Sequence, residues 1–526
     1  MLLGSPLYST IRPSYFEMRP RRESNEPERS VPYARLYFAF PLARLIKDCN
    51  VNKTGDAQTP QYMAAAEHTP SEGEHAQTLE ETLQDKEDLK NAQTEDSGGK
   101  KSKHKPFWKS LGPGLITGAA DDDPAGIGTY SVAGAQFGYG LLWLTPACIP
   151  LMIAVQEMCG RVGVITGQGL AAVIKTHYPK WLLYGSVVLL IGANVFNIFA
   201  DLNVMAASAR MLFHGPNWVW LTLLAASIMT AQVLIPYRIY VRLLKWLCLA
   251  LLAYVVTALL PAVHNDWGQI AYHSIVPSWS WKPQFMMTVV GYLGTTISPY
   301  LFFWQAGEEV EEEIAQGKAD APGHRTQNVS EEEIRGLRAD TIVGMVASQA
   351  VTFFIIICTA ATLHAKGITD INTAQDAARA LLPLGPAAYW LFTLGILGTG
   401  LLAIPTLAGS AAYAVSEAFG WRYGLYRRFQ RARGFYFTIA AMIVAGYVLN
   451  FVRAISPVKA LFYSAVLNGV VAVPLLVLLM LVCNNRQIVN NRVNGPVTNV
   501  LGWLTVVLMG AAVAFMFWAM ATGKAS

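Results

Sequence analysis

Three consecutive carboxylates, Asp121, Asp122 and Asp123, stand directly before Pro124 inside an otherwise apolar stretch. A charged side chain at the centre of a bilayer costs at least about 2.5–3.5 kcal/mol on insertion scales. Proline removes a backbone hydrogen bond and, with glycine beside it, interrupts a helix. Interruption frees backbone carbonyls, and carbonyls together with a carboxylate are hard oxygen ligands for cations. The stretch 119–128 therefore predicts a cation site at a helix break.

A second apolar stretch, 291–304, is interrupted in a similar way by Pro299 and small polar residues. The two breaks fall in the first and sixth apolar segments, which are corresponding positions in two halves of five segments each. Either proline alone is compatible with a simple kink, which membrane helices tolerate. Interrupted segments at corresponding positions of two repeats indicate the binding site of a secondary transporter, and the aspartates at one break favour that interpretation.

The elements that must position both breaks are membrane spans. The chain has 526 residues, 53% hydrophobic and 14% charged, whereas soluble proteins usually have roughly 25% charged residues. Apolar runs of about 20 residues recur and predict an all-α integral membrane protein. We expect eleven spans, at 111–137, 140–164, 181–212, 218–236, 242–262, 284–306, 338–364, 386–417, 435–453, 457–483 and 498–521. Basic residues gather in alternate loops, which places the N-terminus in the cytoplasm and the C-terminus outside.

Residues 1–105 are polar, charged and poor in aromatic residues, so we expect a disordered cytoplasmic extension, with the transporter domain at 106–526. The net charge of +5 is spread over short loops, which argues against a nucleic-acid partner. The six cysteines are scattered singly, so neither a zinc site nor a disulfide framework is indicated. No obligate protein partner is evident.

The sequence GPGLITGAADDDPAGIGTYSVAGAQFGYG, residues 112–140, resembles the first helix of the NRAMP family of proton-coupled divalent metal transporters. That family opens with GPG and breaks the helix at an Asp-Pro-Gly-Asn motif. The resemblance covers about residues 106–521 and implies a LeuT-type fold of eleven helices in two inverted repeats, with helices 1 and 6 broken. It also implies a bacterial inner (plasma) membrane location. Divalent metal ions and protons would be the transported species, and no cofactor is expected.

The spacing from GPG makes Asp123 the metal-binding carboxylate of the resemblance, with Ala120 offering its backbone carbonyl. The chain departs from the family at the other ligand positions. Gly126 replaces the asparagine, Thr295 the alanine and Ser298 the methionine of helix 6. Thioethers prefer soft ions, whereas carboxylates, carbonyls and hydroxyls suit magnesium and manganese. Manganese, magnesium or iron is the expected substrate, with the harder ions favoured.

A polar stripe occupies the third span, where Asn194, Asn197 and Asp201 lie three and four residues apart on one helical face. Such a stripe faces the bundle interior or a water-filled path, or serves interhelical hydrogen bonding alone. The resemblance implies a proton route through Asp201 and through Tyr300, which replaces the family's helix 6 histidine.

Further along the chain, Asn468 resembles the family's polar residue near the site, and Val204 replaces the next carboxylate of the proton route. Two alternatives stay open. A LeuT-fold symporter of a small organic solute would use Asp123 for a substrate amine. A non-transporting sensor would use the same scaffold, with the N-terminal extension as its support. An intramembrane aspartyl protease would need a GxGD motif, which the sequence lacks, so we expect no enzyme.

Overall fold

The computed structural model describes residues 113–234, 249–325, 329–452 and 455–522. Within these ranges the chain is helical apart from one short antiparallel pair of strands, β1 (Ala319–Ala321) and β2 (His324–Arg325). The predicted N-terminal extension and its boundary at 105 lie outside the described residues.

Helices occupy the described parts of the first five expected spans. They are α3 (Pro113–Asp121), α4 (Pro124–Phe137), α5 (Leu144–Thr166), α7 (Lys180–Phe213), α8 (Asn217–Leu234), η3 (Leu249–Leu251) and α10 (Leu252–Leu259). Shorter elements between spans are η2 (Gly138–Leu141), α6 (Leu170–His177) and α11 (Trp267–Ile275).

The second set of expected spans is also helical. It comprises α12 (Pro283–Thr296), α13 (Pro299–Ala315), α14 (Glu331–Thr362), α16 (Ala387–Phe419), α17 (Arg433–Val452), α18 (Pro457–Cys483) and α20 (Pro496–Ala521). The connecting elements are η4 (His364–Lys366), α15 (Ala374–Ala378), η5 (Arg379–Leu384) and α19 (Arg486–Val489).

The first and sixth spans are both broken, as the sequence predicts. The first is divided into α3 and α4, and the sixth into α12 and α13. Pro124 and Pro299 each open the second half-helix, where a missing backbone N–H costs no helical hydrogen bond. The residues before them, Asp123 and Ser298, have extended backbone conformations, with φ of −69° and −73°. Backbone groups on both sides of each break are therefore released from the helical ladder.

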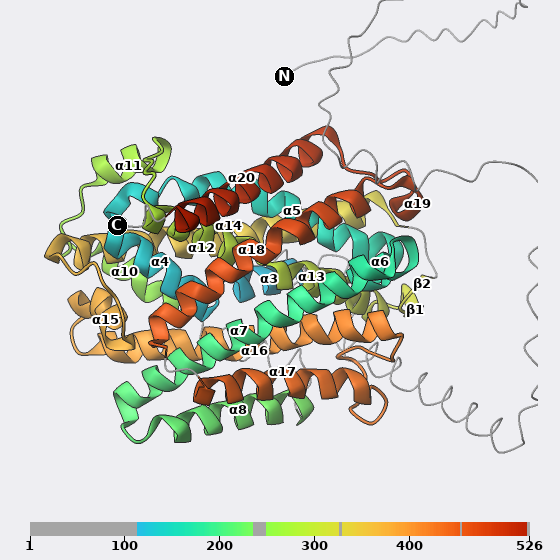
Figure 1. Cartoon of the computed structure of the whole chain (residues 1–526), viewed down its shortest axis with the longest axis horizontal. Helices are drawn as coiled ribbons and strands as arrows, with labels where there is room; N and C mark the ends of the chain where they lie inside the picture. The colour runs from blue at the N-terminus through green and yellow to red at the C-terminus, as the bar shows by residue number, and fades with distance from the viewer. Residues whose placement is uncertain (1–112, 235–248, 326–328, 453–454, 523–526) are drawn as a thin grey trace, which may run out of the picture. The chain divides into compact units, whose positions relative to one another are not determined.

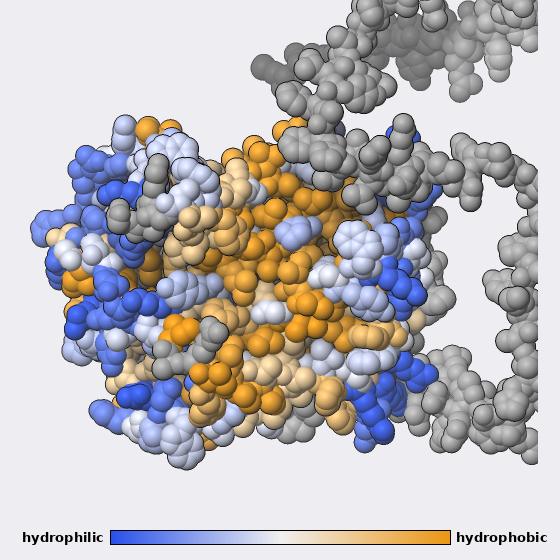
Figure 2. Space-filling view, viewed as in Figure 1, coloured by the Kyte–Doolittle hydropathy of each residue, from blue (hydrophilic) through white to orange (hydrophobic). Residues whose placement is uncertain are grey.

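An apolar surface surrounds the helical bundle. Figure 2 shows a hydrophobic band across the middle of the visible face, with hydrophilic side chains gathered at its two ends. Its large exposed side chains include Val188 on α7, Val448 on α17 and Val507 on α20. Within the described residues, eight helices are long and apolar enough to cross a membrane, the broken α12–α13 pair counted as one. The all-α membrane fold is confirmed, while the count of eleven spans stays a prediction.

The two halves pack against each other in a reciprocal manner. In the first span α3 packs on α14, and in the sixth span α13 packs on α5. Each broken span thus packs on the second span of the other half. The third spans of the two halves, α7 and α16, lie side by side (Figure 1). The contact between α3 and α14 is close because Gly118 and Gly344 meet backbone to backbone, where a methyl group on either would overlap the other helix. This packing fixes α3 immediately before its break.

Candidate cation site at the two helix breaks

Asp123 lies at the N-terminus of α4 and is 1% exposed. Its Oδ1 accepts a hydrogen bond from the backbone N–H of Gly126 at 2.6 Å and a longer one from Thr295 Oγ1 at 3.5 Å. Oδ2 is buried and has no hydrogen-bond partner in the described part of the chain. One carboxylate oxygen is therefore held by the helix terminus, while the other is available to a ligand.

Gly126 allows this arrangement because it has no side chain. A Cβ there would lie 3.2 Å from Thr295 Oγ1 and 3.4 Å from Asp123 Oδ1. A larger residue would push α12 away from α4. The structure thus brings three of the predicted ligand positions together, Asp123, Gly126 and Thr295, across the two breaks.

Asp201 faces the same region from α7. It is fully buried, neither of its oxygens has a hydrogen-bond partner among the described residues, and it interacts electrostatically with Asp123 and with the backbone of Ala125. Asp201 lies beside the first turn of α4, so its carboxylate is close to that of Asp123.

Two buried asparagines add further unsatisfied polar atoms. Both side-chain atoms of Asn197, one turn before Asp201 on α7, lack partners within the described ranges. The same holds for Asn468 on α18, next to Gly469, which packs on Gly294 just before the α12 break. A buried polar group without a partner costs about 1–3 kcal/mol, so such groups indicate bound ligand or water. Carboxylate and amide oxygens are of the type that a hard cation binds.

The other predicted residues already have partners in this conformation. Ser298 Oγ donates to the carbonyls of Thr295 at 2.7 Å and of Gly294 at 3.1 Å, so it caps the end of α12. Tyr300 donates its hydroxyl proton to the Ala120 carbonyl at 2.8 Å, which joins the two breaks directly. The hydroxyl would have to leave before that carbonyl could bind a metal ion.

Asn194 differs from the rest of the α7 stripe. Its Nδ2 donates to the Leu407 carbonyl at 2.8 Å and to Ser410 Oγ at 2.9 Å, both on α16. These bonds fasten α7 to α16, which is the packing role that the sequence left open for the stripe. The two residues one and two turns further along, Asn197 and Asp201, have no such bonds in the described structure.

Asp121 and Asp122 are not among the predicted ligands, although both are buried beside the first break. Their carboxylates meet the Ser348 hydroxyl of α14 at 2.9 and 3.0 Å. No group of three or more His, Cys, Asp or Glu side chains in the described ranges has metal-holding geometry. A cation at the breaks would therefore depend on two carboxylates at a time, completed by hydroxyl, amide and carbonyl oxygens and water.

The site is closed at the end of the bundle where α3 and α14 begin. Asp340 accepts a hydrogen bond from the backbone of Gly114 at 2.6 Å, and Thr117 donates to Gln305 on α13. These contacts hold α3 against α14 and α13 at this end of the bundle.

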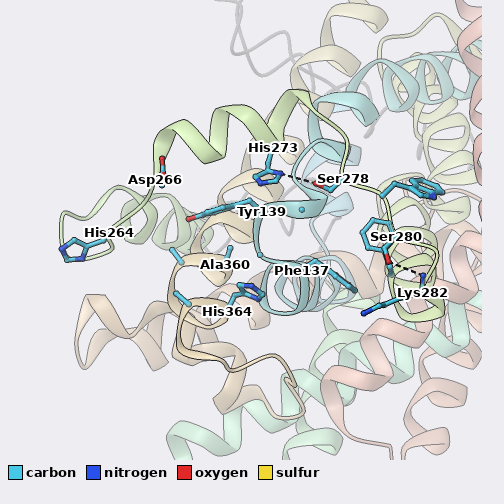
Figure 3. Close-up of a pocket in the computed structure, with 16 residues that line it drawn as sticks. Phe137, Tyr139, His264, Asp266, His273, Ser278, Ser280, Lys282, Ala360 and His364 are labelled. Atoms are coloured by element: carbon cyan, nitrogen blue, oxygen red, sulfur yellow. Dashed lines mark hydrogen bonds between the residues drawn. The ribbon is translucent and has the colours of Figure 1, made fainter. Parts of the chain in front are cut away.

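A cavity of about 640 Å³ opens at the opposite end, where α4 ends and α12 begins (Figure 3). Its lining includes Phe137, Tyr139, His273, Lys282 and His364, and none of the residues at the breaks. A ring nitrogen of His364 lies 2.8 Å from the Ala135 carbonyl, which ties α14 to the last turn of α4. Burial and the nearby Asp266 carboxylate raise the pKa of Tyr139. The cavity is a vestibule that ends before the buried carboxylates.

Comparison with known proteins shows which family and which solved structures this chain resembles. Residues 114–519 match the family model described as natural resistance-associated macrophage protein-like (Nramp). A divalent metal cation transporter MntH from Burkholderia ambifaria is 26% identical over 418 residues, covering 78% of this chain and 88% of the relative. The MntH transporter of Caldanaerobacter subterraneus is 24% identical, with 76% and 90% covered. The crystal structure of the Eremococcus coleocola manganese transporter superposes with a TM-score of 0.61 at 18% identity, over 80% and 88% of the two chains, which shows a shared fold.

Proposed function

The chain belongs to the Nramp family, and we propose that it is a secondary transporter that carries divalent metal ions into the cytoplasm. The observation that carries this proposal is the buried, unpartnered Oδ2 of Asp123 opposite the two unpartnered oxygens of Asp201. Two carboxylates in a protein interior are costly unless a cation or protons compensate them. A divalent cation between them balances both charges, and the amide oxygens of Asn197 and Asn468 supply neutral ligands of the same hard type.

The proposed substrate is a hard divalent ion, with manganese or magnesium favoured and cadmium disfavoured. The residues gathered at the two breaks offer oxygen atoms, and Ser298 stands where the family resemblance expects a thioether. Magnesium keeps several waters when it binds, so it would need more room beside Gly126 than the observed conformation leaves. Relatives named divalent metal cation transporters and a structural neighbour named a manganese transporter support this class of substrate.

Proton coupling is part of the proposal. Asp201 is the second carboxylate at the site, and Tyr300 connects it across the break to α3 through the Ala120 carbonyl. We assign the proton route to these two residues. Val204 takes the position of the next carboxylate, so the route beyond Asp201 must use water or a different side chain.

The proposed orientation places the start of α3 in the cytoplasm of a bacterial inner membrane, following the distribution of basic residues. In that orientation the vestibule of Figure 3 faces outward, and Asp123 is occluded from both sides. Release to the cytoplasm then requires α3 to leave α14, which breaks the bond from Gly114 to Asp340.

Uptake into proteoliposomes tests the proposal. The full-length protein should take up Mn²⁺ or Mg²⁺ faster than empty vesicles, and faster still with an inward proton gradient. Asp123→Ala should remove this uptake, whereas Asp370→Ala, at an exposed aspartate in the loop before α15, should not. Uptake of amino acids instead of metals would support an organic-solute symporter, and no uptake of either would support a sensor.

A further inference from the structure

We propose that Asp121, Asp122 and Ser348 form a second site for a hard divalent cation, on the α14 side of the first break and separate from the site at Asp123. It rests on the proposed function for its biological role, because it adds a second ion beside the transported one. Its existence is testable by binding alone.

The carboxylates of this second site converge on one hydroxyl. Ser348 Oγ lies 2.9 Å from Asp121 Oδ2 and 3.0 Å from Asp122 Oδ1. A serine hydroxyl has one hydrogen, so it can donate to only one of the two carboxylates at a time. Asp121 Oδ1 is buried and has no partner among the described residues. The three residues therefore hold more acceptor oxygens than the available protein donors satisfy.

The hydroxyl of Tyr130 lies close enough to Asp121 and Asp122 to interact with them electrostatically. Thr352 lies one turn after Ser348 on α14, and its fully buried hydroxyl has no hydrogen-bond partner in the described ranges. That hydroxyl faces Tyr130, and both Asp121 and Asp122 act electrostatically on Tyr130. The Tyr130 hydroxyl in turn lies 3.2 Å from Thr296 Oγ1 at the α12 break. Carboxylates and hydroxyls without sulfur or imidazole select hard cations.

The balance of charge requires a second compensating group. Asp121, Asp122, Asp123 and Asp201 are all buried, and in the described part of the chain no basic side chain forms an ion pair with any of them. One divalent ion between Asp123 and Asp201 accounts for two negative charges. Asp121 and Asp122 remain beside Ser348, and a second divalent ion would compensate them in place of protons.

The place of this site in the fold gives the second ion a mechanical effect. Asp121 ends α3, and Ser348 belongs to α14, against which α3 packs through Gly118 and Gly344. An ion shared by the two helices strengthens the contact that closes the site at the end where α3 begins. Loss of this ion would favour the movement of α3 that release requires.

Equilibrium binding of Mn²⁺ to the purified full chain tests the inference, with free Mn²⁺ measured by electron paramagnetic resonance. The wild type should bind two Mn²⁺ per chain. Asp121→Asn/Asp122→Asn should bind one, and Asp123→Ala should also bind one, at the other site. Ser348→Ala should keep both but weaken one by about tenfold. Asp376→Asn, at an exposed helix cap, is the matched control and should bind two.

One Mn²⁺ per wild-type chain, or two in the Asp121→Asn/Asp122→Asn variant, would overturn the inference. Repeating the titration in sodium chloride and in choline chloride identifies the ion, because loss of the second Mn²⁺ in sodium alone would assign the site to a monovalent cation. If the double variant does not fold, Ser348→Ala decides, since an unchanged titration there counts against the site. The proposed function would instead fail if the wild type took up no metal ion, or if binding and uptake did not depend on Asp123.

Discussion

At the α3–α4 break the residue before the proline is Asp123, and at the α12–α13 break it is Ser298. Both have extended backbones and precede a half-helix that begins with proline. Asp123 reaches forward to the N–H of Gly126, whereas Ser298 reaches back to the carbonyls of Gly294 and Thr295. The same backbone interruption therefore presents an unsatisfied acceptor in one helix and a self-satisfied hydroxyl in the other.

This difference separates two tasks that a transport site must combine. The first break collects negative charge without a basic partner in the described residues, so it determines that a cation binds. The second break contributes neutral groups, Thr295 toward Asp123 and Tyr300 toward Ala120, that fix where the first break lies. Charge at one break and alignment at the other predict mutational effects of different size.

The largest effect should follow removal of the charge at the first break. Asp123→Ala removes the available Oδ2 together with Oδ1, which anchors the carboxylate to the N-terminus of α4, and it leaves Asp201 buried without a partner across the site. Truncating one member of a buried charge pair costs about 2–5 kcal/mol, which is at least about thirtyfold in affinity. Mn²⁺ binding and uptake should both fall by this amount or more. Normal transport in Asp123→Ala, with loss in Asp121→Ala, would move the transport site to the other side of the break.

Asp201→Asn should have the next largest effect. The amide keeps one ligand oxygen but removes the second charge opposite Asp123, so Mn²⁺ affinity should fall by about tenfold, or 1.4 kcal/mol. Stimulation of uptake by a proton gradient should disappear, because the asparagine amide neither gains nor loses a proton at physiological pH. Unchanged affinity and unchanged pH dependence in Asp201→Asn would remove this residue from the site.

The contrast between the breaks also shows what the sequence can reveal. Proline combined with neighbouring glycine and polar residues predicts both interruptions, whereas Pro150, Pro405 and Pro474 lie inside continuous helices. The choice of Asp123 over its two neighbours follows from the family resemblance, whose distance from GPG to the aspartate it matches, and the structure places that residue at the N-terminus of α4. Its role as a metal ligand stays a prediction.

Contacts between distant segments could not be predicted in the same way. Ser348 lies 226 residues after Asp122, and nothing in its local sequence distinguishes it from other serines in apolar helices. The hydroxyl of Tyr300 donates to the Ala120 carbonyl because α13 packs beside α3. That proximity depends on packing across the bundle. The polar residues of α7 contact two different helices, because one helical face can touch more than one neighbour. Asn194 bonds to α16, while Asp201 faces α4.

A change of ligand type at the second break should have a selective effect of intermediate size. Ser298→Met introduces a thioether at the α12 break, and thioethers favour soft ions. Competition by Cd²⁺ against Mn²⁺ uptake should increase by about tenfold if the new contact contributes roughly 1.4 kcal/mol. Ser298→Ala removes the hydroxyl without adding sulfur and should leave Cd²⁺ competition as in the wild type. Strong Cd²⁺ transport by the wild type, with no gain in Ser298→Met, would contradict the preference for hard ions.

The smallest effect should come from Thr295→Ala, which tests whether the second break serves alignment alone. Its hydroxyl approaches Asp123 Oδ1 at 3.5 Å, a long contact to an oxygen that Gly126 already binds at 2.6 Å. Losing such a bond costs about 0.5 kcal/mol, so Mn²⁺ affinity should change by about two- to threefold. Thr288→Ala is a matched control two turns earlier on α12, where the hydroxyl bonds to its own helix at Gln284. It should leave affinity unchanged. A loss in Thr295→Ala as large as in Asp201→Asn would make the hydroxyl a direct metal ligand, and the second break would then share the binding of charge with the first.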